Sequence, residues 1–294
     1  MALPVYATFP QRLWHYSYLV FCAVVLFFLV APLIVVIPLS FSKSPFLYFT
    51  PEFLRLDPDA FSLRWYRAML GMCSDPGITT VCSDRWKDGF RNSLFIAIFA
   101  TFFATILGTL ASLALSRAYT PFRKALMAIM ISPLIVPLII TASGMFMFFA
   151  KFHLVATFTG MIIAHTVLGL PFVVITVTAT LISFDYNLTR AASGLGGTPF
   201  YNFFKVQVPL ITPGVVSGAL FAFITSFDEV VVVLFIGSQN QITLPRQMWS
   251  GIRQEISPTI LSAATVLVIL SILLLTTVEL LRRRSERLRG IRPS

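Results

Sequence analysis

Six long apolar segments restrict the fold of this chain more than any other feature of its sequence. They cover residues 18–39, 93–115, 125–149, 154–181, 214–236 and 260–281. An α-helix needs roughly 20 apolar residues to cross the ~30 Å hydrocarbon core of a bilayer. Strands of a membrane barrel are shorter and alternate in polarity, and open sheet edges leave backbone groups unsatisfied in lipid. The sequence therefore predicts an all-α, polytopic membrane helix bundle of about six transmembrane helices, with residues 1–294 forming a single transmembrane domain.

The balance of residue types favours insertion into lipid over an apolar core inside a soluble protein. Charged residues make up 12% of the chain and hydrophobic residues 57%, whereas a soluble domain carries roughly 25% charged residues. The first apolar segment has a second interpretation, as a removable signal peptide. It is longer than the apolar part of such a peptide, contains Pro32 and lacks a clear small-residue cleavage site, so we expect it to remain as a span.

Basic residues near the ends of the apolar segments predict their orientation, because short loops rich in Lys and Arg stay in the cytoplasm. Such residues occur in the loop at 117–124 and in the tail at 282–294, which contains Arg282, Arg283, Arg284, Arg287, Arg289 and Arg292. Six spans then place both termini in the cytoplasm, the tail included, and make residues 42–91 an external loop.

The formal net charge of +10 belongs mostly to the cytoplasmic face, because acidic and basic residues cancel in the 42–91 loop. This distribution predicts contact with anionic membrane lipid and gives no reason to expect nucleic acid as a partner. The same loop contains Cys73 and Cys82, which form a candidate disulfide in an oxidising compartment. Their spacing alone does not establish the geometry of a disulfide.

Enzymatic and metal-binding signals are not visible in the sequence. His153 and His165 are isolated, so no metal site is expected, and no nucleophile stands in a recognisable pattern with a base. The sequence has no Gly-x-x-x-x-Gly-Lys-Ser/Thr phosphate-binding loop. We therefore expect a non-catalytic role on an aqueous path, with no cofactor bound by this chain.

The segment 183–212, between the fourth and fifth apolar segments, is too polar for a span and carries helix-capping residues. Asp185 or Asn187 is suited to cap a short helix. Gly196 and Gly197 are suited to end it by a left-handed turn. The pattern predicts a cytoplasmic hairpin of two short helices.

The second helix of this hairpin is expected to begin after Thr198, with Pro199 at its first position. Pro209 and Pro213 are expected to break the chain before the fifth span. Helical spacing puts four apolar side chains on one face, namely Phe200, Phe203, Phe204 and Val208. Two interpretations stay open for this face: packing against the chain's own helices, or docking to a cytoplasmic partner.

The residues from Arg190 to Gly197, Arg-Ala-Ala-Ser-Gly-Leu-Gly-Gly, followed by Val-Gln-Val-Pro-Leu at 206–210, resemble a family signature. It is the loop of permease subunits in binding-protein-dependent ABC importers, in which Glu-Ala-Ala precedes a glycine and a later proline. Arg190 stands where that family usually has Glu, which indicates an altered partner surface. The resemblance implies the fold of a type I importer permease in the bacterial inner membrane.

The resemblance also implies partners. These are a second permease, homologous or identical, two ATPase subunits that bind ATP and Mg, and an external solute-binding protein. It assigns contact with the ATPase to Arg190, Ala191, Ala192, Leu195, Gly196, Gly197, Pro199, Phe200, Phe203 and Phe204.

Asp228 and Glu229 follow Ser226 in the fifth apolar segment, where carboxylates are expensive and face a bundle interior or a water-filled path. Neighbours on a helix point about 100° apart, so we expect one carboxylate to face the path and the other a partner helix or subunit. The competing interpretation is that both are structural. Pro133 and Pro137 are expected to kink the third span, which makes it a candidate path wall.

The C-terminal half, including Leu244-Pro245 and Met248-Trp249, resembles the spermidine/putrescine branch of these permeases. An acidic site is suited to a cationic amine as the substrate. The alternative substrate is an opine or an amino-acid-like solute, because similar permeases transport such compounds. Trp65 and Trp249 are expected outside the membrane, as interfacial anchors or facing the binding protein or an amine. A self-contained secondary carrier competes with these hypotheses, but we see no repeated halves.

Overall fold

The computed structural model describes residues 8–72, 84–117, 119–254 and 257–288. It divides into a first unit, residues 1–82 with 256–265, and a second unit, residues 83–255 with 266–294. Within the described residues, five helices are long and apolar enough to cross a membrane, or six if one bent pair counts as a single span. The predicted polytopic helix bundle is confirmed, whereas the cytoplasmic location of both termini stays a prediction. Cys73 and Cys82 lie outside the described residues.

The first unit contains α1 (Phe9–Leu39), the short α2 (Pro51–Leu54), the 3-10 helix η1 (Pro58–Ala60) and α3 (Arg64–Met69). Trp65 organises the segment after α1, because its Nε1 donates a hydrogen bond to the Ser42 carbonyl oxygen at 2.7 Å. The Ser262 hydroxyl, near the start of α13 (Thr259–Leu288), donates to the Trp65 carbonyl oxygen at 3.3 Å. Trp65 is 1% exposed, so its expected role as an interfacial or partner-facing residue is wrong.

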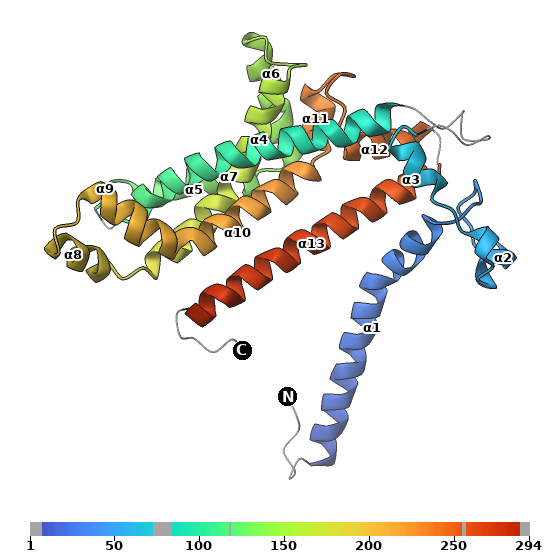
Figure 1. The fold of residues 1–294 in the computed structure, drawn as a ribbon, viewed down its shortest axis with the longest axis horizontal. Helices are drawn as coiled ribbons and strands as arrows, with labels where there is room; N and C mark the ends of the chain where they lie inside the picture. The colour runs from blue at the N-terminus through green and yellow to red at the C-terminus, as the bar shows by residue number, and fades with distance from the viewer. Residues whose placement is uncertain (1–7, 73–83, 118, 255–256, 289–294) are drawn as a thin grey trace. The chain divides into compact units, whose positions relative to one another are not determined.

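In the second unit, α4 (Asp84–Leu115), α7 (Phe158–Ile182) and α10 (Val208–Phe227) pack along one another (Figure 1). Small residues allow this approach, as they do in other membrane bundles. A Cβ atom added at Gly108 would lie 2.7 Å from the Cβ atom of Val173. A buried cluster joins the three helices, formed by Ala104, Val173, Val177, Leu181, Ile211 and Ala222.

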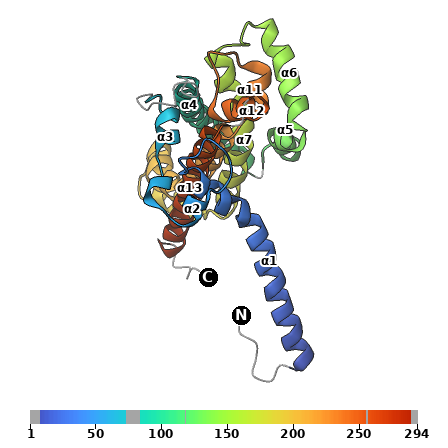
Figure 2. The ribbon, with the colours of Figure 1, turned by 90° about the vertical axis from the view of Figure 1, so that its right-hand side faces the viewer.

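The third apolar segment forms two helices, α5 (Arg123–Ile135) and α6 (Leu138–Lys151), which meet at an angle of 104° (Figure 2). The expected bend of this segment is present, but it is a break between two helices and not a kink within one helix. Pro133 stays inside α5, while Val136 is extended with ψ of 134° just before Pro137. A proline disfavours the helical conformation of the residue before it and lacks an N–H for the helix. This accounts for the break at Val136.

Helix α10 begins earlier than expected. The hairpin helices α8 (Asn187–Gly194) and α9 (Pro199–Asn202) are followed by a π-helical turn, η2 (Phe203–Gln207), which continues directly into α10. The expected break at Pro209 and Pro213 is therefore wrong. Pro209 lies in the first turn of α10 and Pro213 inside it. A local π turn and neighbouring helices can accommodate the missing N–H groups of prolines in membrane helices.

The fifth apolar segment also divides, because α10 ends at Phe227 and α11 (Val231–Ile236) follows as a separate helix. The chain then enters α12 (Leu244–Gln254), whose first residue donates from its backbone N–H to the Ser93 hydroxyl of α4 at 2.8 Å. Asn92 adds hydrogen bonds from its amide to the carbonyl oxygens of Asn240 and Ile242. The link between α11 and α12 is thus hydrogen-bonded to the N-terminal part of α4.

Candidate functional site

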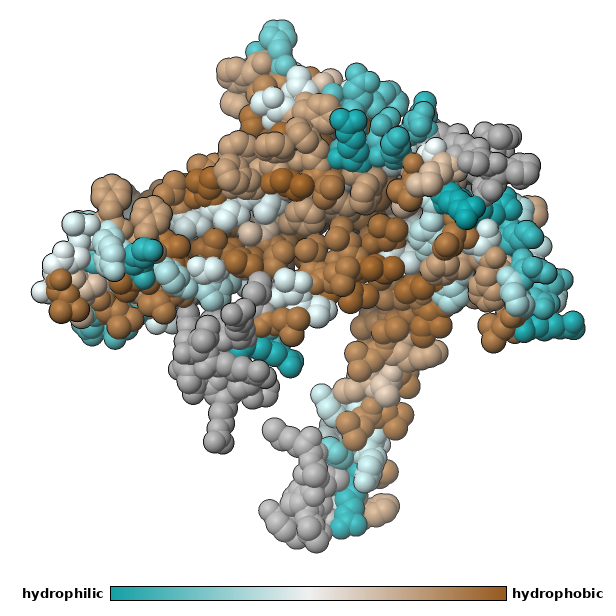
Figure 3. Space-filling view, in the orientation of Figure 1, coloured by the Kyte–Doolittle hydropathy of each residue, from teal (hydrophilic) through white to brown (hydrophobic). Residues whose placement is uncertain are grey.

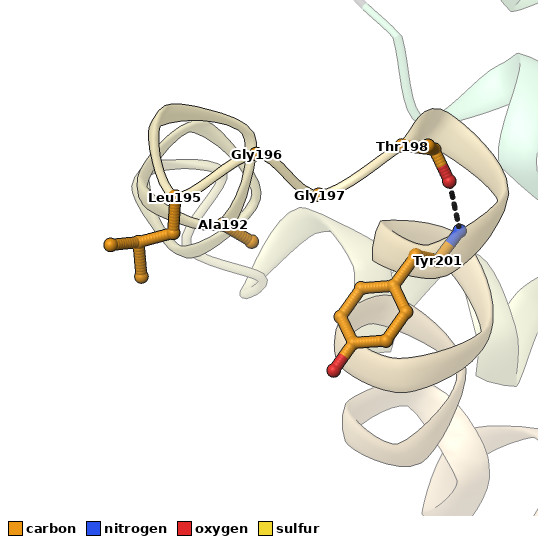
Figure 4. Close-up of a pocket in the computed structure, with 6 residues that line it drawn as sticks. All are labelled: Ala192, Leu195, Gly196, Gly197, Thr198 and Tyr201. Carbon is orange, nitrogen blue, oxygen red and sulfur yellow. Dashed lines mark hydrogen bonds between the residues drawn. The ribbon is translucent and has the colours of Figure 1, made fainter.

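The residues expected to begin and end the hairpin helices make local contacts, although the N-cap residue of α8 is Tyr186, whose side chain makes no capping hydrogen bond. The Asp185 carboxylate accepts from the Asn187 backbone N–H at 2.9 Å. Gly196 takes φ of +87°, the left-handed conformation that favours glycine. The Thr198 hydroxyl accepts from the Tyr201 backbone N–H at 3.3 Å (Figure 4), with Pro199 at the start of α9.

Asn202 holds the two hairpin helices together, and sequence reasoning did not identify it. Its buried amide donates to the Ser193 hydroxyl at 2.8 Å and to the Gly197 carbonyl oxygen at 3.3 Å. Asn202 stands between the aromatic residues Tyr201 and Phe203, and nothing in this local sequence indicates a bond to the preceding helix. The bond to Ser193 runs from α9 back to α8, so the hairpin is a connected structure.

The tip of the hairpin presents apolar side chains that the described part of the chain leaves open. Leu195 is 90% exposed and Phe200 79% exposed, and Phe204 is also exposed. Phe203 and Val208 are half-buried, so the predicted four-residue face is only partly presented. Around the tip lies a depression of about 410 Å³ (Figure 4) lined by Ala192, Leu195, Gly196, Gly197, Thr198 and Tyr201.

Figure 3 shows how the polarity of the hairpin end differs from that of the helix sides on one face of the second unit. Hydrophobic residues cover the sides of α4 and α10, where lipid is expected, and the hairpin end combines hydrophobic and hydrophilic residues. Arg190 is exposed on α8. The hairpin therefore offers apolar groups beside a positive charge. Apolar groups beside a charge are suited to bind the surface of a partner protein.

A second candidate site lies at the break between α10 and α11. The Asp228 backbone N–H donates to the Ile224 carbonyl oxygen at 3.0 Å and completes α10. Glu229 is 7% exposed, and its Oε1 accepts from the Val232 backbone N–H at 2.9 Å. Glu229 thus caps the N-terminus of α11, while the Asp228 side chain is exposed on the chain.

The two neighbouring carboxylates are therefore separated by a helix end. The expectation that both lie on one continuous helix is wrong, because α10 stops at Phe227. The Asp228 side chain is exposed and the Glu229 side chain is buried. The role of Asp228 on the path stays a prediction.

Ser226 is the last residue but one of α10, beside this break, and contacts His165 of α7. His165 is 1% exposed, and its Nδ1 lies 2.8 Å from the Ser226 hydroxyl and 3.1 Å from the Ser226 carbonyl oxygen. The sequence shows His165 only as an isolated histidine, since 61 positions separate it from Ser226. Phe227 adds an edge-on contact with Phe90 of α4, with ring centroids 6.3 Å apart.

The remaining predicted path residues lie on other elements. Pro133 is inside α5, Pro137 is the residue before α6, and Trp249 is exposed on α12. Arg246 of α12 donates to the Ser238 carbonyl oxygen at 3.0 Å, and burial lowers the pKa of its guanidinium. Among the described residues, no three His, Cys, Asp or Glu side chains gather as metal ligands.

Comparisons with known proteins agree with the resemblance seen in the hairpin. The family model described as "Binding-protein-dependent transport system inner membrane component" matches residues 104–289. The spermidine/putrescine transport system permease protein PotC of Escherichia coli (strain K12) is 31% identical over 147 residues, which are 50% of this chain and 56% of that protein. The putrescine transport system permease protein PotI of the same strain is 32% identical over 142 residues, 46% of this chain and 50% of that protein.

The chain thus spans about half the length of these curated relatives. A solved structure, of a bacterial ABC transporter involved in the import of the acidic polysaccharide alginate, has a similar fold. Its TM-score is 0.67 at 15% sequence identity, and the match covers 94% of this chain and 99% of that one. At this identity the likeness shows the fold alone.

Proposed function

This chain belongs to the inner membrane components of binding-protein-dependent transport systems, and from this we propose that it forms part of the translocation path for a small organic cation. Members of this family are transporter components of the bacterial inner membrane and are not enzymes. We further propose that separate ATPase subunits drive the transport through the hairpin at 183–212.

The exposed tip of the hairpin carries the proposal of ATPase coupling. Leu195 and Phe200 are large apolar side chains that the described residues leave uncovered, and such groups at a helix end are suited to an apolar recess on a partner. Bonds from Asn202 to α8 connect the two helices, and η2 continues without a loop into α10. A displacement of the hairpin by the partner is therefore transmitted to α10 as a movement of a rigid element.

The proposed partners follow from what this sequence lacks and what it exposes. It contains no phosphate-binding loop, so ATP and Mg are assigned to two ATPase subunits. A second permease, identical or homologous, completes the path, and an external solute-binding protein delivers the solute.

The cationic substrate class is supported by Asp228 and by the two relatives. An exposed carboxylate at a helix break in the apolar part of the chain is suited to contact an ammonium group. Both relatives are named for the transport of putrescine or of spermidine and putrescine.

Reconstitution tests this proposal. The chain is assembled in proteoliposomes with candidate ATPase, second permease and binding-protein subunits from the same organism, and uptake of labelled spermidine is measured with and without ATP. ATP-dependent uptake is expected. Uptake by the chain alone would contradict the subunit role and favour a self-contained carrier. ATP-dependent uptake of an opine or amino acid in place of spermidine would contradict the cationic substrate class.

A pair of leucine variants tests the hairpin in the same assay. Leu195→Ser removes an exposed apolar group from the tip, and we expect a loss of uptake of about tenfold or more, as for a buried interface anchor. Leu188→Ser is the matched control, because Leu188 is also exposed on α8 but does not line the depression. Equal uptake by the two variants would contradict docking through the tip.

A further inference from the structure

His165 contributes a polar side chain to the packed interface between α7 and α10. It is 1% exposed, and its Nδ1 lies within hydrogen-bond distance of both the hydroxyl and the carbonyl oxygen of Ser226. Burying a polar group in an apolar bundle is unfavourable unless it is hydrogen-bonded. The position of His165 therefore requires a reason beyond the filling of space.

The contact with Ser226 lies at the C-terminal end of α10. The last carbonyl groups of a helix have no partner within the helix, and Ser226 is the last residue but one of α10. A carbonyl oxygen can only accept a hydrogen bond, so the bond to the Ser226 carbonyl oxygen requires the tautomer of His165 in which Nδ1 carries the proton. A side chain of α7 thus caps α10 from outside.

Asp228 lies between two such caps. On its N-terminal side, Ser226 is held by His165. On its C-terminal side, Glu229 is held by the backbone N–H of Val232. Both capping side chains are buried, while the Asp228 side chain is exposed. The chain therefore presents one exposed carboxylate on a short link whose two ends are fixed by buried polar groups.

We propose that His165 is a positioning residue for Asp228. By capping α10, it determines where the helix ends and hence where the Asp228 carboxylate stands on the path. This inference rests on the proposed role of Asp228 in contacting a cationic solute. A purely structural His165 would instead contribute to packing of α7 on α10 without influencing the affinity for the solute.

Two substitutions of His165 separate these roles. The side-chain amide of Asn can replace the Nδ1 donor, whereas Leu has a similar apolar bulk and no donor. In the assembled transporter, His165→Leu is expected to raise the KM for spermidine uptake about 2- to 10-fold, the effect of one hydrogen bond. His165→Asn should keep the KM of the unmodified protein. Equal KM values for both variants, or a change confined to the maximal rate, would overturn the proposal.

A double-mutant cycle shows whether His165 acts through Asp228. In an Asp228→Asn background, His165→Leu should cause no further rise in KM. A rise of the same factor as in the unmodified background would show that His165 acts by another route, and the proposal would fail.

Thiol labelling distinguishes failure of this inference from failure of the proposed substrate contact. Asp228→Cys is introduced into a chain whose three natural cysteines are replaced by Ser, and its reaction with a water-soluble maleimide is timed in the assembled transporter. His165→Leu should change the labelling rate, and His165→Asn should restore it. An unchanged rate in both variants would refute positioning, even if Asp228→Asn impairs uptake. A changed rate while Asp228→Asn leaves uptake intact would refute only the substrate contact.

Discussion

The Nδ1 atom of His165 lies 2.8 Å from the hydroxyl oxygen of Ser226, and this contact joins the N-terminal part of α7 to the C-terminal end of α10. It places a buried polar group beside the link between α10 and α11 that contains Asp228 and Glu229. On the other side of that break, Glu229 caps α11. The four residues from Ser226 to Glu229 therefore combine a helix end, an exposed carboxylate and a helix start.

Asp228 and Glu229 should respond differently to removal of their charge. Asp228→Asn is expected to lower spermidine uptake without changing thermal stability, because its side chain is exposed. Glu229→Ala removes the cap of α11 and should destabilise the protein by about 1 kcal/mol. Glu229→Gln keeps an acceptor oxygen and serves as the matched control. Uptake assays and thermal unfolding of the purified chain measure the two effects. Loss of stability in Asp228→Asn alone would contradict this division.

Close packing of α4 on α7 depends on the absence of a side chain at Gly108. Gly108→Ala should destabilise the protein by about 1–3 kcal/mol, because its Cβ would stand 2.7 Å from that of Val173. Gly144→Ala is the control, since no atom lies within 4 Å of its added Cβ. The midpoint of thermal unfolding in detergent measures both. Equal midpoints would show that α4 and α7 are less closely packed than described.

Asn202 should determine how firmly the hairpin holds together. Asn202→Ala removes the hydrogen bonds to Ser193 and Gly197, and faster amide hydrogen exchange is expected over residues 187–207. Asn187→Ala is the control, because the bond at Asn187 uses its backbone N–H. Exchange is followed by mass spectrometry. Unchanged exchange in Asn202→Ala would mean that other contacts connect the two helices.

Orientation in the membrane can be tested with single cysteines. If the positive-inside pattern holds, Leu195→Cys should react with an impermeant maleimide only in inside-out vesicles. Asn240→Cys, exposed in the link between α11 and α12, should react only from the external side. Labelling of both positions from one side would contradict an odd number of crossings between them and the predicted placement of the hairpin.

The hairpin could be predicted in detail because its signals are local. The bond from the Asn187 N–H to Asp185, the cap at Thr198 and the left-handed turn at Gly196 depend on residues within a few positions of each other. The sequence did not decide whether the apolar residues at its tip are exposed, since exposure depends on what the rest of the chain covers. Asn202 was missed for the same reason, because its bond to Ser193 links two helices.

The apolar segments by themselves determined that this chain crosses a membrane several times, because the length and apolar character of each segment are set by the thickness of the bilayer. Only the tertiary structure decided where those segments break. A proline produced a sharp turn at Val136 and none at Pro213, since the cost of a missing N–H depends on the surrounding helices. The separation of Asp228 from Glu229 and the pairing of His165 with Ser226 likewise depend on helices distant in sequence. The sequence gives the polarity of each residue, but the hydrogen-bond partner of a buried polar group is determined by how the helices pack.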